Sequence, residues 1–522
     1  MRSLILGALA IVVALAGPAH AENTLRWAMH GDALTFDPMG QNEGPTFILN
    51  QQVYEPLINL DPAMNLIPGL ATSWEVAEPT RWVFHLREGV TFHNGEAFTA
   101  EDVKFSIERA QHPFSNYLQL VNEIESVDII DDHTVAFNTY APAPLLPQKL
   151  ISIFMMSKSW SEEHGVEVPQ NFSAGEENYA VRNANGTGPY ILELRESDIR
   201  TIFVRNENWW GWAEGLGGNV DRIVFTPIEN DATRVAALLS GELDLILDPP
   251  LQDLRRIERT AGLKLEEVAQ IRTIFLGMNQ RDDELESSNI DGRNPFQDQR
   301  VRRAIYQAIN EDAIRDRIMR GRAAPAGMII SPGINGYEET FDERLPFDPM
   351  AARDLLSAAG YGDGFSVTLD CPNNRYVNDE EICQAVVGML AQIGIDVNLD
   401  AQPKSLHFPK IENQTTDFYL LGWTPNTLDS ADVFDYLIWT EGSWNASGYS
   451  NAAIDEMLPA ISSELDPEVR RQMIHDAWAL IIQDVAYVPL HNQVLTWAMR
   501  DNVDMPIIAN NLPQFSWASI GE

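Results

Sequence analysis

The alternation of hydrophobic and polar positions is clearest between residues 365 and 399. Hydrophobic side chains stand at every second position in 365–369 and again in 395–399, which is typical of strands with one buried face. Between these strands the hydrophobic residues follow a helical spacing, at Ile382, Val386, Met389, Leu390 and Ile393. Gly394 ends the helix. A strand, a helix and a second strand in this order form a βαβ unit, so the sequence predicts a parallel pair of strands.

Three further helices are indicated by their caps and spacing. Asp231 is the expected N-cap of a helix that ends at Gly241, before a strand-like run at 243–246. Asp348 caps a second helix, because proline occupies the first helical position after it. Hydrophobic residues at helical spacing over 301–309 predict a third. These elements indicate an α/β fold.

Two segments have a different pattern. Residues 74–98 and 124–140 are rich in Trp, Val, Phe and Thr, and they contain the turn pairs Asn94-Gly95 and Asp131-Asp132. Short β-rich runs joined by tight turns are typical of antiparallel sheets. We therefore expect an antiparallel region beside the parallel one.

Length and charge narrow the class of protein. The chain has 522 residues, and at roughly 150 residues per domain this length predicts several hydrophobic cores. Its 36 Lys and Arg residues against 76 Asp and Glu residues give a formal charge of -40. A surface of this charge repels nucleic acids and anionic membranes, so we expect no nucleic-acid partner.

The first 21 residues have the parts of a secretory signal peptide. Arg2 supplies the positive charge, residues 4–16 form an apolar run, and Ala19-His20-Ala21 is a cleavage site with small residues at its ends. The alternative is a membrane anchor, but the apolar run is shorter than the ~20 residues that span a bilayer. We expect cleavage after Ala21 and a periplasmic mature protein.

The chain has two cysteines, Cys371 and Cys383. In an oxidising compartment, two cysteines separated by a short loop favour a structural disulfide over a metal pair. The alternative is two unpaired buried thiols. We expect the disulfide.

Residues 82–103, WVFHLREGVTFHNGEAFTAEDV, resemble the signature of the dipeptide and oligopeptide solute-binding family of ABC importers. Other motifs recur in the order of that family: Gly186-Thr187-Gly188-Pro189-Tyr190, Asn208-Trp209-Trp210-Gly211, Pro295-Phe296 with Arg300-Val301-Arg302, and Gly422-Trp423. The resemblance covers residues 22–522. The signature segment itself is expected to be scaffold, with His93 a hydrogen-bonded structural histidine rather than a ligand.

The resemblance implies a fold. It is the two-lobed periplasmic binding protein fold, of α/β class, with an additional subdomain in the first lobe. Two crossover strands join the lobes and are expected near 275–279 and 488–492. The implied ranges are 22–56, 181–276 and 490–522 for lobe I, 57–180 for the extra subdomain, and 277–489 for lobe II.

The resemblance also implies a function. Such a protein captures a short peptide or peptide-like solute between its lobes and delivers it to an inner-membrane ABC permease, here as a monomer. The alternative cargoes on this fold are a metal chelate such as a nickel complex, an opine, haem or an oligosaccharide. An exported hydrolase is the alternative from another class.

The sequence offers little support for catalysis. It has no Gly-x-Ser-x-Gly elbow, no His-Glu-x-x-His and no Gly-x-x-x-x-Gly-Lys loop. Its ten histidines are scattered, so no compact metal cluster is visible. We expect a protein that is not an enzyme and that holds no resident cofactor or metal.

Two loops that follow predicted strands are the candidate site, because ligands of open α/β sheets bind beyond the carboxyl ends of strands. In the loop 371–378, Arg375 can hold a carboxylate with two hydrogen bonds. In the loop 424–430, Asp429 stands where the family's peptide binders hold an aspartate that pairs with the ligand's α-ammonium. The remaining candidate binding residues are Trp423, Tyr376, Asn426, Trp444, Asn445 and Tyr449.

Each assignment has a structural alternative. Asp429 is also placed to cap a following helix. Arg375 is near Asp379 and Glu381 in sequence and could form a surface ion pair with either. The aromatic residues of 444–449 could pack on the body of the lobe. Pro425 and Leu428 occupy places where many dipeptide binders have small polar residues, which leaves dipeptide selectivity open.

Overall fold

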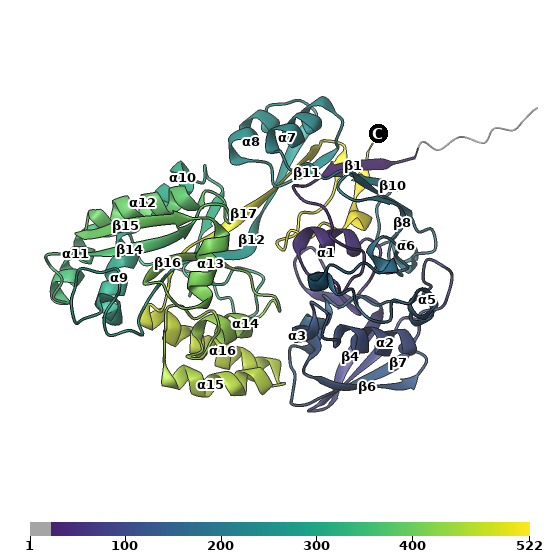
Figure 1. The fold of residues 1–522 in the computed structure, drawn as a ribbon, viewed down its shortest axis with the longest axis horizontal. Coiled ribbons are helices and arrows are strands. Elements are labelled where there is room, and N and C mark those ends of the chain that lie inside the picture. Colours follow the sequence, from purple (N-terminus) through teal and green to yellow (C-terminus); the bar gives the residue numbers. More distant parts are fainter. Residues whose placement is uncertain (1–21, 522) are drawn as a thin grey trace, which may run out of the picture.

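The computed structural model describes residues 22–521, which form two lobes joined by two long strands (Figure 1). These strands are β12 (Leu263–Met278) and β17 (Val488–Arg500), which pair antiparallel over most of their length. They lie at the centre of an 11-stranded sheet with the order β15-β14-β16-β12-β17-β11-β1-β10-β9-β8, and β13 also pairs with β17. One continuous sheet therefore runs through both lobes, as the resemblance implies.

Lobe I contains the other end of this sheet. β1 pairs parallel with β10 and β11, and Gly241 ends α7 in a left-handed conformation. Asn230 caps α7, not the predicted Asp231, because its side-chain oxygen accepts from the amide of Thr233. The elements are β1 (Thr24–Ala28), β8 (Tyr190–Glu196), β9 (Arg200–Arg205), β10 (Arg222–Phe225), β11 (Leu245–Leu247), β18 (Val503–Asp504), β19 (Ser519–Ile520), α1 (Gly44–Asn50), α6 (Trp210–Ala213), α7 (Asp231–Ser240), α8 (Leu251–Glu258) and the 3-10 turn η5 (Phe515–Trp517).

The segment expected as an extra subdomain has its own antiparallel sheet, in the order β4-β5-β7-β6, and its own hydrophobic core. This confirms the antiparallel prediction. Thr99 and Asp102 form a capping box at the start of α2. The elements are β2 (Ile58–Leu60), β3 (Leu66–Pro68), β4 (Ala71–Glu78), β5 (Arg81–Leu86), β6 (Ile124–Asp131), β7 (Thr134–Thr139), α2 (Ala100–Ala110), α3 (Leu118–Val121), α4 (Leu146–Leu150), α5 (Lys158–His164), η1 (Phe172–Ala174) and η2 (Tyr179–Val181).

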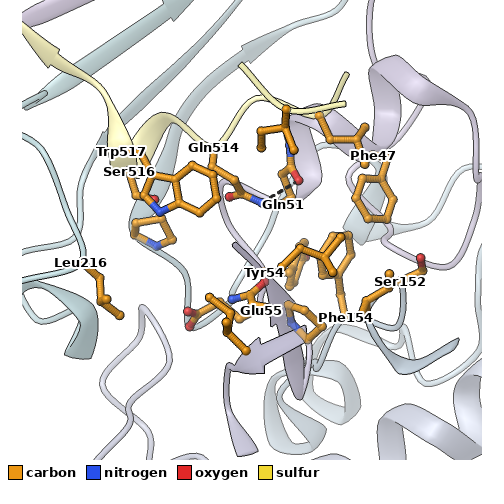
Figure 2. A pocket seen from close by; sticks show the side chains of 18 of the residues that line it. Phe47, Gln51, Tyr54, Glu55, Ser152, Phe154, Leu216, Gln514, Ser516 and Trp517 are labelled. Atoms are coloured by element: carbon orange, nitrogen blue, oxygen red, sulfur yellow. Dashed lines mark hydrogen bonds between the residues drawn. The ribbon is translucent and has the colours of Figure 1, made fainter. Parts of the chain in front are cut away.

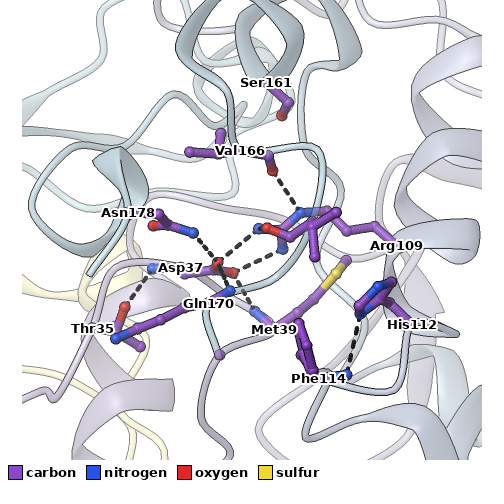
Figure 3. Close-up of polar contacts among 12 residues, drawn as sticks. Thr35, Asp37, Met39, Arg109, His112, Phe114, Ser161, Val166, Gln170 and Asn178 are labelled. Atoms are coloured by element: carbon purple, nitrogen blue, oxygen red, sulfur yellow. Dashed lines mark hydrogen bonds and ion pairs between the residues drawn. The ribbon is translucent and has the colours of Figure 1, made fainter. Parts of the chain in front are cut away.

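A buried ion pair fastens this subdomain to lobe I (Figure 3). Both carboxylate oxygens of Asp37, in the loop after β1, accept from the guanidinium of Arg109 on α2 at 2.7 and 2.8 Å. The amides of Met39 and Gln170 and the side chain of Asn178 also donate to Asp37. Neither charged side chain is exposed to solvent. The cluster therefore joins segments far apart in the sequence through one carboxylate.

Lobe II confirms the predicted βαβ unit. β14 and β15 pair parallel in register from Phe365 with Ile395, and α12 connects them. Asp348 caps α11 as expected. The elements are β13 (Ala323–Pro325), β14 (Phe365–Pro372), β15 (Ile395–Gln402), β16 (Phe418–Trp423), η3 (Pro295–Gln297), α9 (Gln299–Ala308), α10 (Glu311–Arg317), α11 (Pro349–Ala358), α12 (Asp379–Ala391), α13 (Lys404–Glu412), α14 (Ser430–Val433), the π-helical turn η4 (Phe434–Ile438), α15 (Ala452–Ser463) and α16 (Pro467–Asp484).

Cys371 at the end of β14 and Cys383 on α12 are joined by a disulfide, with their Cα atoms 6.6 Å apart. The bond holds the start of α12 against the strand that precedes it. The loop between them contains Arg375 and Tyr376. This candidate loop is therefore fixed at both ends.

The lobe boundaries at 276/277 and 489/490 stay predictions. β12 pairs with β16 of lobe II from Thr273 onward, a few residues before the expected crossover.

Over residues 22–521, no helix is long and apolar enough to cross a bilayer.

Candidate functional site

The candidate loops of lobe II begin at the same edge of the sheet. β14 is parallel to both β15 and β16, so the carboxyl ends of all three strands lie together. The loop after β14 holds Arg375 and Tyr376, and the loop after β16 holds Asn426. The topology therefore places the two loops beside each other beyond the carboxyl ends of the strands, as the sequence predicts.

The two loops contact each other through Tyr376 and Gly422. The Tyr376 hydroxyl donates to the Gly422 carbonyl at 3.2 Å and accepts from the Gly422 amide at 2.9 Å. A Cβ atom at Gly422 would lie 2.6 Å from the Cδ1 atom of Ile274 and 2.8 Å from the Tyr376 ring, so a larger residue there would displace these side chains. Tyr376 therefore holds the two loops together, and only 8% of its surface is exposed.

Arg375 lies beside the ring of Tyr376, with its guanidinium carbon 5.1 Å from the ring centroid. Its backbone amide donates to Asp379, at the start of α12. Among residues 22–521, no carboxylate lies within ion-pair distance of its guanidinium, so the surface pair with Asp379 or Glu381 does not form. Whether the Arg375 head group binds a ligand stays a prediction.

Asp429 has a different environment from the one expected. It is fully buried, and its carboxylate accepts two hydrogen bonds of 2.7 Å from the guanidinium of Arg470 on α16. The side chain of Asn335 and the amide of Ala431 donate to the same carboxylate. Its charge is compensated and its acceptor positions are occupied inside lobe II. The geometry favours the alternative, in which Asp429 caps α14 and forms a core ion pair.

Two other candidates also lie inside lobe II rather than on the cleft. Asn445 is 1% exposed and donates to the carbonyls of Trp439 and Tyr449. Tyr449 is 3% exposed, and its hydroxyl donates to Asp484 at 2.7 Å. Both residues stabilise the loop that precedes α15. The sequence could not distinguish this role from ligand contact, because both need polar groups on a loop.

The remaining aromatic candidates form a cluster. The Trp423 ring lies 5.6 Å from the Trp444 ring and 5.5 Å from the Tyr436 ring, between centroids. All three side chains are partly exposed. They form an apolar wall at the carboxyl end of β16.

Beside this wall lies a cavity of about 440 Å³ between the lobes. On its lobe II side it is lined by Asn426, Thr427, Ala431, Asp432, Asp435 and Tyr436. Residues of the extra subdomain, among them Asn116, Tyr117, Glu123 and Lys149, form the opposite wall. In Figure 1, α14 lies opposite α3 across this gap.

Two carboxylates in this cavity were missed by the sequence reasoning. Asp432 accepts from the Trp423 indole at 2.8 Å and from the Asn426 amide at 3.0 Å. Desolvation raises the pKa of Asp432 to about 6. Desolvation also raises the pKa of Asp435 to about 6, although Lys149 lowers it in part. The available signal was their spacing of three residues, which places both on one helical face.

We expect binding of a cationic solute to depend on these carboxylates and hence on pH. Their pKa values are raised on folding, so both are neutral at low pH and charged above about 6. An ammonium needs the charged form, and affinity should therefore fall roughly tenfold between pH 7 and 5 for each carboxylate required. Calorimetric titration across this range measures the effect.

The same solute with its amine acetylated is the control and should show no such dependence. For the unliganded protein the linkage has the opposite sign, because a raised pKa favours the protonated folded state, so these groups add stability as the pH falls from about 6 toward 4. Equal pH profiles for the free and acetylated amines would show that these carboxylates do not meet the amine.

A second, smaller cavity of about 110 Å³ lies in lobe I (Figure 2). Tyr54 and Glu55 face Gln514 and Trp517 of the C-terminal segment across it. Burial raises the pKa of Glu55 to about 7. Its oxygens accept from Thr187 and from the indoles of Trp209 and Trp210.

Glu55 thus connects two of the sequence motifs, Gly186–Tyr190 and Asn208–Gly211. In the first motif a Cβ atom at Gly188 would lie 2.6 Å from the Val53 carbonyl, and the Gly188 amide donates to that carbonyl at 2.8 Å. His93 is likewise structural, because its Nε2 hydrogen-bonds to the Gly188 carbonyl and burial lowers its pKa to about 4. These motifs are scaffold.

Solved structures share the fold. The TM-score is 0.84 with HbpA2 from Haemophilus parasuis, at 21% sequence identity over 96% of this chain and 100% of that one. The TM-score is 0.73 with the periplasmic binding protein DppA from Helicobacter pylori in complex with the peptide STSA, at 23% identity over 96% of this chain and 98% of that one. This shared fold confirms the predicted fold class, the two-lobed α/β fold.

Similarity to curated proteins extends over nearly the whole chain. The chain is 27% identical to the glutathione-binding protein GsiB of Salmonella typhi, over 95% of this chain and 96% of the relative. It is 28% identical to the glutathione-binding protein GsiB of Escherichia coli K12, again over 95% of this chain and 96% of the relative. The sequence model of a protein family, the bacterial extracellular solute-binding proteins, family 5, matches residues 65–445, which is more than half of this chain. Both relatives are named as binding proteins. The chain therefore belongs to family 5 of the bacterial extracellular solute-binding proteins, which serve ABC importers.

Proposed function

We propose that this protein captures a short peptide or peptide-like solute with a free amine in the cavity between its lobes. The observation that carries the proposal is the pair Asp432 and Asp435 beside the aromatic wall of Trp423 and Tyr436. A carboxylate in an enclosed cleft provides the fixed countercharge that a desolvated ammonium needs. An aromatic face attracts the same cation or an apolar side chain.

The cavity also suits the size of such a solute. Its volume of about 440 Å³ is within the range of roughly 300–1,000 Å³ found for small-molecule sites. Relatives of this chain are named for glutathione, which is a peptide-like molecule. Arg375 at the neighbouring strand end is the group we propose for a carboxylate of the solute.

We further propose that the mature protein begins after Ala21, acts as a monomer in the periplasm and delivers its solute to an inner-membrane ABC permease. The signal-like segment 1–21 lies outside the described residues and supports the proposal by sequence alone. N-terminal sequencing of the exported protein should start at Glu22, and its scattering mass should be that of one chain. A different first residue would contradict the proposed cleavage site, and the mass of a dimer would contradict the proposed monomer.

Calorimetry over a panel of solutes tests the cargo. The panel contains glutathione, di- to pentapeptides, nickel chelates, opines, haem and oligosaccharides. We expect saturable binding of peptides or glutathione, and a melting temperature that rises with them, because solute at 100 times its Kd stabilises by about 2.7 kcal/mol. If only another class of solute in the panel binds, that class and not a peptide is the cargo.

We expect the lobes to close on the solute by bending at β12 and β17. Both walls of the cavity carry polar groups, and two-lobed proteins commonly bring such walls onto one solute by hinge closure. Small-angle X-ray scattering should therefore show a smaller radius of gyration at saturating solute. Saturation shown by calorimetry with an unchanged radius would argue against the hinge.

A further inference from the structure

The turn at the tip of the hairpin β2–β3 contains one buried side chain. The Asp61 carboxylate fixes the turn, because it accepts from the amides of Ala63 and Asn65, each at 2.9 Å, and from the Asn65 side chain at 3.0 Å. The Met64 amide donates to the Asp61 carbonyl. Pro62, Ala63 and Asn65 are exposed, whereas Met64 is only 7% exposed. A methionine at a hairpin tip is therefore shielded from solvent.

Met64 packs with the core of lobe II and not with the core of its own subdomain. Its hydrophobic cluster contains Ile334, Leu428 and many other side chains of lobe II. The core of the extra subdomain includes Ile58 and Leu70, on either side of the hairpin, but not Met64. Met64, Ile334 and Leu428 also line one cavity of about 300 Å³. The methionine thus reaches across the gap between the lobes.

The lobe II side of this contact is connected to the solute cavity. Leu428 lies in the loop 424–430, and Asn426 and Thr427 of that loop line the cavity of about 440 Å³ between the lobes. The Leu428 carbonyl accepts from the Asn335 amide at 2.9 Å, which joins this loop to the segment that holds Ile334. Met64 therefore docks beside the loop that forms one wall of the solute cavity.

Both sides of the contact have a strained backbone. Met64 has φ of 69° and Leu428 has φ of 55°, in the left-handed region that residues other than glycine seldom adopt. Such conformations persist only where the surroundings fix them, and they are concentrated in ligand clamps and switch regions. The hydrogen bonds of Asp61 support the first, and the bond from Asn335 supports the second. The backbone on each side is thus fixed in the conformation that places both side chains at the shared cavity.

We propose that the turn 61–65 is a latch, in which Met64 docks onto Ile334 and Leu428 of lobe II and holds the two lobes at their closed separation. Docking buries an apolar side chain that the open form exposes, so the hydrophobic effect favours the closed form. The latch rests on the proposed function in that the solute is the molecule enclosed by closing. Met64 is absent from the described residues that line the solute cavity, so it is a positioning residue that acts on all solutes alike.

The first test needs no solute. It compares wild type with Met64→Gln, which keeps the length of the side chain but makes it polar, and with Met64→Leu, which keeps it apolar. Small-angle X-ray scattering should give a larger radius of gyration for Met64→Gln than for the other two. Met350→Gln is the matched control and should leave the radius unchanged, because Met350 on α11 is 74% exposed. Equal radii for wild type and Met64→Gln would exclude the latch.

Oxidation by hydrogen peroxide reports docking in wild type directly. Mass spectrometry should find that Met64 forms its sulfoxide about tenfold more slowly than Met350, because the docked thioether is shielded from solvent. Equal rates would show that Met64 is exposed in solution, and they would overturn the latch.

The second test is calorimetry with glutathione and di- to pentapeptides. Met64→Gln should weaken every solute that binds wild type by about tenfold or more, since burial of a methionine side chain corresponds to at least this factor, and should leave their order of affinity unchanged. Unchanged affinities, or a changed order that shows direct contact with the solute, would overturn the latch. If no solute binds wild type while the scattering and oxidation results hold, the proposed function fails and the latch stands, so the two failures are distinguishable.

Discussion

Asp429→Asn should destabilise lobe II and leave solute affinity nearly unchanged. The asparagine can still accept the amide of Ala431 and so cap α14, but it leaves the Arg470 guanidinium buried without a countercharge. Removing one member of a buried ion pair costs about 3–5 kcal/mol. For a lobe of this size that lowers the melting temperature by roughly 6–20 °C. Differential scanning calorimetry measures the shift.

Asp466→Asn is the matched control, because Asp466 caps α16 on the surface and asparagine caps equally well. It should leave the melting temperature unchanged. Combining Asp429→Asn with Arg470→Gln should cost less than the sum of the single changes, because both remove the same contact. If Asp429→Asn keeps its melting temperature and instead weakens binding about 30-fold, Asp429 contacts the solute's amine, as the family resemblance implies.

The case of Asp429 shows why the candidate site was only partly predictable. Its position after a strand end and before a helix could be inferred from local sequence. Its partner Arg470 is 41 residues away on another helix, and no local pattern specifies that contact. A carboxylate that caps a helix and one that binds a ligand look the same in sequence. Only the tertiary structure shows whether its oxygens are already occupied.

The fold was more predictable, because its elements depend on periodicity. The alternation at 365–369 and 395–399 and the helical spacing between them gave β14, α12 and β15. The predicted N-cap of α7 was wrong by one residue, because Asn230 and Asp231 are both good N-caps. The bulge of β12 at residues 270–272, where its pairing with β17 shifts register, left no signal in the sequence, because it arises from the mismatch of two strands far apart in the chain.

Asp37→Asn should weaken the attachment of the extra subdomain to lobe I. The change leaves Arg109 fully buried and without a carboxylate, which costs about 3–5 kcal/mol. Asp128→Asn, in the same subdomain, is the matched control, since Asp128 forms a half-exposed pair with Arg81 that contributes about 1 kcal/mol or less. Thermal unfolding at pH 7 should show a large loss of melting temperature for Asp37→Asn and little for the control.

The pH dependence separates the buried pair from a general loss of packing. Burial by itself would raise the pKa of Asp37, but the Arg109 guanidinium and the backbone amides hold it below the usual value. A lowered pKa means that the pair stabilises wild type above the carboxylate's unfolded pKa, of about 4, and that this contribution is lost as the pH falls further. The gap in melting temperature between wild type and Asp37→Asn should therefore narrow below pH 4. A gap that stays constant down to pH 2 would show that the loss comes from packing around the side chain and not from its charge.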